Sequence, residues 1–86
     1  MMKEFKYVIT DRVGIHARPA GIVVKMAQKF QSEILVYRGE AQADAKKLMQ
    51  IMALGVKNGE EVRVTTEGPD EDEAAAAMEN VLKENL

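Results

Sequence analysis

The chain has 86 residues, with 12 basic and 14 acidic side chains, one histidine and no cysteine. This length supports one core that buries roughly 60–65% of the unfolded chain's surface, so we expect a single domain over residues 1 to 86. The composition excludes a disulfide framework and a Cys- or His-rich metal site, and no metal or cofactor is expected. A net charge of −2 without a basic stripe argues against nucleic-acid binding. Apolar runs are far shorter than the roughly 20 residues that span a bilayer, so we expect a cytoplasmic protein without membrane insertion.

The N-terminal half contains strand and helix patterns in turn. Lys3 to Thr10 has the two-residue apolar alternation of a half-buried strand. Ala17 to Phe30 has helical spacing, but its two adjacent valines favour a strand, so tertiary packing must support this helix. Its apolar stripe comprises Ala20, Val23, Val24, Ala27 and Phe30. Glu33 to Tyr37 is predicted as a second strand, and Glu40 to Asp44 as a short third strand after a turn.

The C-terminal half is predicted to contain helix, strand and helix. Leu48 to Leu54 is a short amphipathic helix, with Gly55 as the first residue beyond its end. A turn at residues 57 to 59 leads into a strand from Glu61 to Glu67. The last helix is predicted to start near Glu71. Asp70 is followed three residues later by Glu73, and this spacing predicts a capping box between the two. Its buried stripe comprises Ala74, Ala77, Met78, Val81 and Leu82.

The acidic run at residues 70 to 73 could also be interpreted as a cation site, but helix capping and a solvated face explain it better. The resulting order is β-α-β-β-α-β-α. This order predicts an α+β open-faced sandwich, in which a four-stranded antiparallel sheet carries three helices on one face.

The only histidine lies where the first helix begins. Pro19 fits only in the first helical turn, so the helix should start near Ala17 and place His16 at or next to the N-cap. The backbone amides of Ala17 and Arg18 have no intrahelical partner, and the helix dipole adds positive potential there. Arg18 adds a planar donor group that can bind two phosphate oxygens at once. A lone histidine is usually an ordinary surface or core side chain, but these neighbours favour a site that holds a phosphoryl group.

The segment from Gly14 to Ala20 resembles the phosphocarrier family HPr of the sugar phosphotransferase system. Similar segments are Ala45 to Met49, Met52 to Gly55 and Glu67 to Glu71, and the resemblance runs from about Phe5 to Leu82. It implies a carrier that receives a phosphoryl group from enzyme I, itself charged by phosphoenolpyruvate, and passes it to enzyme IIA domains.

Within that resemblance, the acceptor is Nδ1 of His16, and Arg18 stabilises the phosphate. The resemblance also implies a monomeric carrier protein that is not an enzyme acting on a small molecule.

The resemblance further implies an apolar docking surface around the histidine and on the short helix. Its expected residues are Ile15, Ala17, Ala20, Gly21, Leu48, Met49 and Met52, with Lys25 and Lys46 at the rim. Flexible methionines suit a surface that accommodates several partners. Methionines at helical spacing are usually core residues, however, and the two lysines are equally well explained as ordinary surface charges. Ile51 or Leu54 is expected in the core.

Three positions depart from the family pattern. Lys47 stands where the family usually has a regulatory serine, so no hydroxyl is present there. Val13 replaces a small polar residue, and Gly21 replaces alanine at a cost of about 0.5–1 kcal/mol in helix propensity. An alternative function is therefore a regulatory adaptor whose phosphorylation state controls a transcription factor or enzyme. A third possibility, an unrelated small α+β ligand-binding module, requires the histidine motif to be coincidental.

Overall fold

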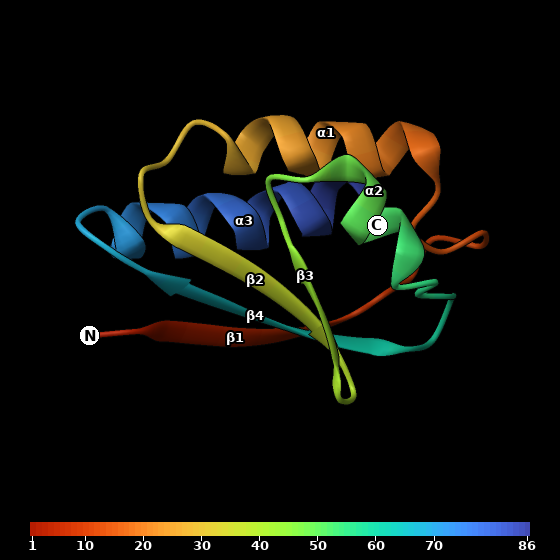
Figure 1. The fold of residues 1–86 in the computed structure, drawn as a ribbon. Helices are drawn as coiled ribbons and strands as arrows, with labels where there is room; N and C mark the ends of the chain where they lie inside the picture. Colours follow the sequence, from red (N-terminus) through yellow and green to blue (C-terminus); the bar gives the residue numbers. More distant parts are fainter.

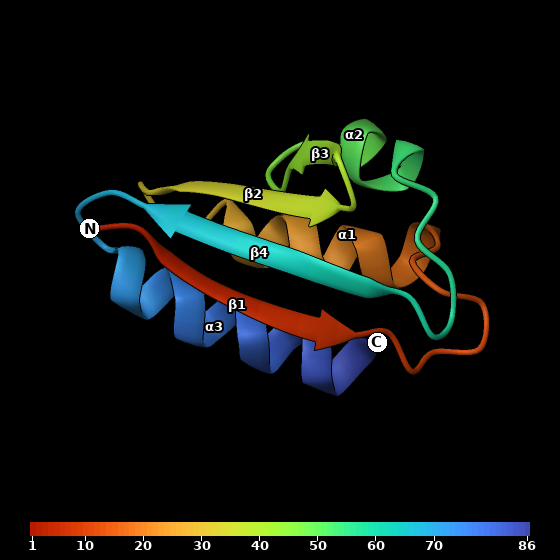
Figure 2. The same cartoon turned by 90° about the horizontal axis from the view of Figure 1, so that it is seen from below.

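The computed structural model describes all 86 residues and contains four strands and three helices. In chain order they are β1 (Lys3–Val8), α1 (Ala17–Ala27), β2 (Glu33–Arg38), β3 (Ala41–Asp44), α2 (Leu48–Ala53), β4 (Glu61–Glu67) and α3 (Glu71–Asn85). The helices cover one face of the sheet (Figures 1 and 2). The predicted element order and the predicted open-faced sandwich are confirmed. None of the three helices combines the length and apolar character needed to cross a bilayer.

The sheet has the strand order β1-β4-β2-β3, and every neighbouring pair is antiparallel. Val64 of β4 lies opposite Phe5 of β1 on one side and Val36 of β2 on the other. Because side chains alternate between the faces of a strand, these three apolar residues face the same layer. Val36 and Val64 are buried in the core, and Phe5 packs against it. The core therefore lies between the sheet and the helices.

The opposite face of the sheet carries polar contacts. Arg63 of β4 pairs with Glu4 of β1 at 3.0 Å, and its guanidinium lies 4.1 Å from the centre of the Tyr37 ring of β2. An arginine over an aromatic ring combines cation–π attraction with shielding of the ring from water. These cross-strand contacts suit a face that no helix covers.

Several predicted boundaries shift when tertiary structure is considered. β1 ends at Val8, two residues before the predicted end, where its pairing with Glu61 of β4 stops. α1 ends at Ala27 and not at Phe30. The amides of Lys29 and Phe30 each bond to a carbonyl three residues back, so the helix closes in a tight turn. The position of Gly55 after the end of α2 is confirmed, and its φ is +63°.

The predicted capping box of α3 is wrong. Asp70 is the N-cap residue, but its side chain makes no capping hydrogen bond to the helix. Its carboxylate instead accepts hydrogen bonds from the amides of Gln31 and Ser32 and from the Ser32 hydroxyl. These bonds lower the pKa of Asp70, the Ser32 hydroxyl most strongly and the Gln31 amide next. The acidic residue therefore ties the start of α3 to the segment before β2.

Candidate functional site

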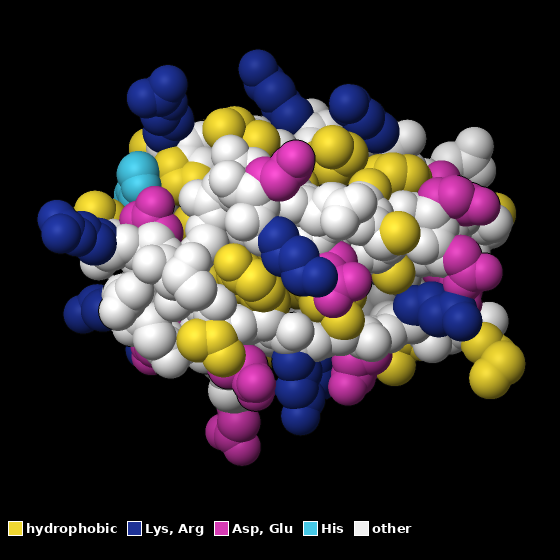
Figure 3. All heavy atoms as spheres, turned by 180° about the vertical axis from the view of Figure 1, so that it is seen from behind, with side chains coloured by type: hydrophobic (Ala, Val, Ile, Leu, Met, Phe, Trp, Pro, Cys, Tyr) yellow, Lys and Arg dark blue, Asp and Glu magenta, His cyan; other side chains and the backbone are white.

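His16 occupies the N-cap of α1, at the end of the loop that follows β1. Its backbone is extended, with φ −117° and ψ 178°, and its side chain makes no capping hydrogen bond. The side chain is 40% exposed. Figure 3 shows it at the molecular surface, toward one end of the molecule, with an acidic group directly beside it. The predicted helix start is confirmed, and capping does not occupy the imidazole nitrogens.

The loop that carries His16 is fixed to the segment after α2. The amide of Ile15 donates to the carbonyl oxygen of Val56 at 3.0 Å, and the amide of Gly14 donates to the carbonyl oxygen of Asp11 at 3.1 Å. Gly14 is buried and adopts a φ of +86°, which a residue without a side chain reaches without strain. The backbone immediately before His16 is therefore held by one hydrogen bond within its own loop and by another to the segment after α2.

Groups that can donate hydrogen bonds to an anion lie beside the imidazole. Arg18 is exposed and takes part in none of the ion pairs of the structure. The amides of Ala17 and Arg18 belong to the first turn of α1, where no helical carbonyl precedes them. His16 and Arg18 line the same open hollow of about 290 Å³, together with Asp11, Pro19, Ile22 and Asn85. The two predicted site side chains thus face a shared space in which positive charge is available to an anion.

Asp11 is a part of this site that the sequence did not reveal. Its Oδ1 lies 3.6 Å from Nε2 of His16. The same oxygen accepts a hydrogen bond from the amide of Val13 at 2.9 Å. No sequence pattern marks an acidic residue five positions before a histidine, because the loop geometry alone brings the two side chains together.

The predicted docking residues on α2 are exposed. Met49 is the most exposed at 77%, and Leu48 and Met52 are close to 40%. α2 lies beside the half of α1 that begins at His16 (Figures 1 and 2). Ile51 is buried on the opposite side, as expected, and attaches this short helix to the core.

The predicted residues around His16 differ in exposure. Ala17 is exposed, and Gly21 and Ile15 are half-buried. Ile15 also packs against the core. The assignment of Ala20 to the docking surface is wrong, because this residue is fully buried in the core stripe of α1. Ile22, which the sequence did not single out, is 42% exposed and lines the hollow beside His16.

The remaining predicted positions flank this surface. Lys25 is exposed, whereas Lys46 is half-buried and its Nζ donates to the carbonyl oxygen of Phe30 at 2.7 Å. Lys46 therefore has a structural contact besides its charge. Lys47 occupies the N-cap of α2, and its side chain makes no capping hydrogen bond. Val13 is 67% exposed and offers no polar atom to the histidine.

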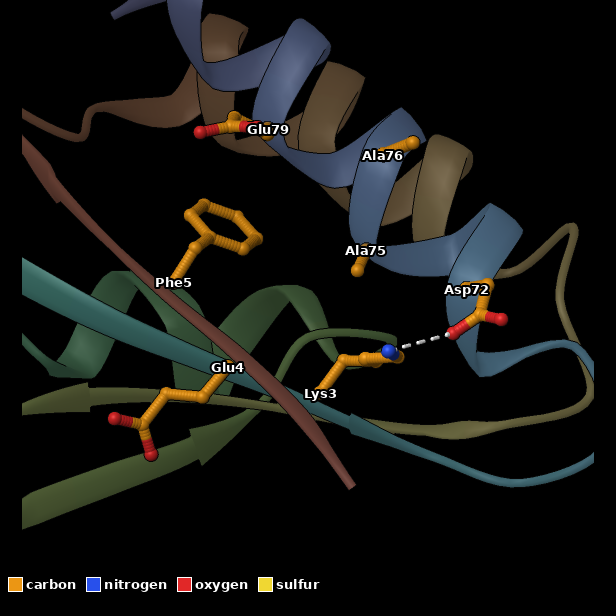
Figure 4. Close-up of a pocket in the computed structure, with 7 residues that line it drawn as sticks. All are labelled: Lys3, Glu4, Phe5, Asp72, Ala75, Ala76 and Glu79. Atoms are coloured by element: carbon orange, nitrogen blue, oxygen red, sulfur yellow. Dashed lines mark ion pairs between the residues drawn. The ribbon is translucent and has the colours of Figure 1, made fainter. Parts of the chain in front are cut away.

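A larger hollow of about 390 Å³ lies between β1 and α3 (Figure 4). Phe5 and Ala75 form part of its wall, and Lys3 pairs with Asp72 across it at 3.4 Å. Its lining residues belong to the beginning of β1 and the N-terminal part of α3, and the beginnings of β1 and α3 lie at the end of the molecule away from the start of α1 (Figures 1 and 2). No histidine lines this larger hollow, and its acidic residues Glu4, Asp72 and Glu79 outnumber its one lysine, so it does not suit an anion.

Comparisons with known proteins place the chain beside one family. Residues 3–84 match the family model described as "PTS HPr component phosphorylation site". The phosphocarrier protein HPr of Mycoplasma capricolum is 40% identical over 81 residues, which are 94% of this chain and 91% of the relative.

Two solved structures illustrate the range of the similarity. The crystal structure of HPr-C-His from Thermoanaerobacter tengcongensis is 40% identical, with a TM-score of 0.91 over 96% of this chain and 93% of the other. Crh, the catabolite repression protein of Bacillus subtilis, crystallised as a swapped dimer. It is 30% identical, with a TM-score of 0.78 over 93% of this chain and 92% of the other.

Proposed function

The chain belongs to the HPr family of phosphocarrier proteins, and from this membership we propose that His16 accepts a phosphoryl group from phospho-enzyme I and donates it to enzyme IIA domains. The observation that carries the proposal is the exposed imidazole at the N-cap of α1, with no capping hydrogen bond and with an unpaired Arg18 lining the same hollow. Nothing else in the chain offers a second imidazole or a thiol for the same chemistry.

The transfer step uses the Nδ1 lone pair of His16 as the nucleophile. A bond from Nδ1 to phosphorus forms while the bond to the donor atom of enzyme I breaks, and its electron pair leaves with the donor. Negative charge on the phosphoryl oxygens faces the Arg18 guanidinium and the first amides of α1. Interactions that strengthen as this charge develops accelerate the step, which is the role proposed for Arg18.

The protein acts as a carrier and not as a catalyst on a small molecule, and it needs no metal or cofactor. We place it in the cytoplasm as a monomer of one domain. The swapped dimer of the relative Crh makes the oligomeric state a necessary measurement. Size-exclusion chromatography with light scattering should give the mass of one chain, and a stable dimer would refute this part of the proposal.

Successive partners dock on one apolar surface beside the histidine. Its residues are Ile15, Ala17, Gly21, Leu48, Met49 and Met52, with Lys25 and Lys46 at the rim and Ile22 added from the structure. Exposed methionines adapt to partners of different shape, which suits a protein that must bind both a donor and an acceptor.

The direct test is a relay assay with phosphoenolpyruvate, enzyme I and a panel of enzyme IIA domains. We expect the chain to be labelled and then to lose the label to at least one enzyme IIA domain. Arg18→Ala should keep the fold, because the side chain is exposed and unpaired, but should slow both transfers. A chain that is labelled but transfers to no enzyme IIA domain would refute the transport role.

That outcome would favour the second candidate, a regulatory adaptor whose phosphorylation state controls a transcription factor or enzyme. The similarity to Crh, whose name refers to catabolite repression, supports this candidate. The two functions share phosphorylation of His16 and differ only in whether the label moves on.

A further inference from the structure

Asp11 is the only acidic side chain that the structure pairs with the single histidine, and its position is fixed from three directions. Its amide donates to the main-chain oxygen of Leu86 at 2.7 Å, its carbonyl accepts from Gly14, and its Oδ1 accepts from Val13. The Leu86 side chain is buried in the core, so this anchor is packed against the rest of the fold. The carboxylate is therefore held in one place beside Nε2 of His16, at 3.6 Å.

We propose that Asp11 is a positioning residue that keeps the His16 proton on Nε2 and thereby leaves the Nδ1 lone pair free for the phosphoryl group. This inference rests on the proposed function of His16. A carboxylate beside one ring nitrogen of a histidine fixes the tautomer, because it attracts the N–H and repels a lone pair. The hydrophobic side chain of Val13, closer in sequence, has no atom that can do this.

The same contact matters in the phosphorylated state. When Nδ1 bonds to phosphorus with Nε2 still protonated, the ring gains a positive charge that faces the Asp11 carboxylate. On transfer to the next acceptor, the acceptor's lone pair attacks phosphorus and the electron pair of the N–P bond returns to Nδ1. The leaving group is then a neutral imidazole. If Nε2 had lost its proton, the leaving group would be an imidazolate anion, which departs far less readily.

The other groups around the ring do not substitute for Asp11. The charged residues that line the hollow with His16 are Asp11 from the loop and Arg18 from α1. α3 contributes Asn85, a neutral amide whose Nδ2 donates to the carbonyl oxygen of Val81 at 2.9 Å and whose Oδ1 carries no charge to attract the ring proton. Arg18 is positively charged and repels a proton on the ring, so Asp11 is the only charged group of the hollow that attracts one.

The test compares Asp11→Asn with Asp72→Asn. Asparagine at position 11 keeps an oxygen that can accept from Val13, so the loop is retained while the charge is lost. Asp72→Asn removes the same charge from an exposed pair with Lys3 at the far end of the sheet and serves as the control. The first readout is the tautomer of His16 in the unphosphorylated protein, from nitrogen chemical shifts.

We expect the Nε2–H tautomer to dominate in the wild type and in Asp72→Asn. In Asp11→Asn its population should be lower.

The second readout is the pH profile of phosphohistidine hydrolysis. In Asp11→Asn the hydrolysis and transfer rates at neutral pH should fall about fivefold, the factor for about 1 kcal/mol at a partly exposed ion pair. High salt should reduce this difference.

The inference is overturned if Asp11→Asn matches the wild type in tautomer and in hydrolysis profile, since Asp11 would then only shape the loop. The tautomer measurement needs no partner protein. If the chain failed to accept a phosphoryl group at all, the proposed function would fall, and the spectrum of the unphosphorylated protein would still decide whether Asp11 sets the tautomer.

Discussion

Replacing Gly14 with alanine tests how the loop that carries His16 is held. A Cβ at this position would overlap the carbonyl oxygen of Val56 and lie 2.7 Å from Cα of Lys57. The left-handed backbone alone costs a residue with a side chain about 1–2 kcal/mol. Relieving the overlap must also move the loop away from Val56 and weaken the hydrogen bond from Ile15, which adds about 0.5–1.5 kcal/mol. We therefore expect a loss of about 1.5–3.5 kcal/mol in the free energy of unfolding.

Gly39→Ala is the matched control. Gly39 also has a positive φ, +59°, but an added Cβ would meet no atom within 4 Å. This variant should lose only the conformational share, about 1–2 kcal/mol. Urea unfolding of both variants, with unchanged slope, gives the difference. Gly14→Ala should also accept a phosphoryl group from enzyme I more slowly, because the loop shift displaces His16, whereas Gly39→Ala should be labelled at the wild-type rate. Equal losses of stability and equal labelling rates in the two variants would refute the close contact with Val56.

Three further changes test other parts of the structure. Met49→Glu should weaken binding to enzyme I and to enzyme IIA together, because it puts a carboxylate into the apolar docking surface. Its free energy of unfolding should change by less than about 0.5 kcal/mol. A large loss of stability with normal affinity for both partners would place Met49 in the core. Lys47→Ser should raise the free energy of unfolding by about 0.5–2 kcal/mol in denaturant melts, because serine can accept a hydrogen bond from an early amide of α2 and removes a positive charge from the positive end of the dipole. Asp70→Asn should lower the thermal midpoint at neutral pH, because the lowered pKa of Asp70 means that its charged form stabilises the fold. This stabilisation is full above the unfolded pKa of about 3.9 and is lost as the pH falls through the folded value. The midpoints of the wild type and of Asp70→Asn should therefore converge below about pH 4. A gap that persists at low pH would contradict the charge explanation, and an unchanged midpoint for Lys47→Ser would mean that another group already satisfies those amides.

The parts of the fold that the sequence predicted well are those governed by local chemistry. β4 runs from Glu61 to Glu67 as expected, because its alternation is regular and turn residues precede it. α1 starts at Ala17 because Pro19 fits nowhere but the first turn. The same local rule placed His16 at the N-cap and Arg18 beside it.

The parts that the sequence did not predict depend on contacts between distant segments. Asp70 has the spacing of a capping residue, but its carboxylate accepts hydrogen bonds from three donors of Gln31 and Ser32 instead. Ser32 lies 38 positions away in the sequence. Ala20 sits on the helix turn next to the histidine, yet packing against the sheet buries it completely. Asp11 reaches His16 only because the loop folds back and Leu86 anchors it. No periodicity or spacing encodes such contacts.

The central claim is that His16 is the sole phosphoryl acceptor. The most direct measurement is the intact mass of wild-type and His16→Ala protein after incubation with phosphoenolpyruvate and a catalytic amount of enzyme I, with circular dichroism to establish that both are folded. The wild type should gain one phosphoryl group that is lost in acid and retained in alkali, and folded His16→Ala should gain none. Full labelling of folded His16→Ala would contradict the account.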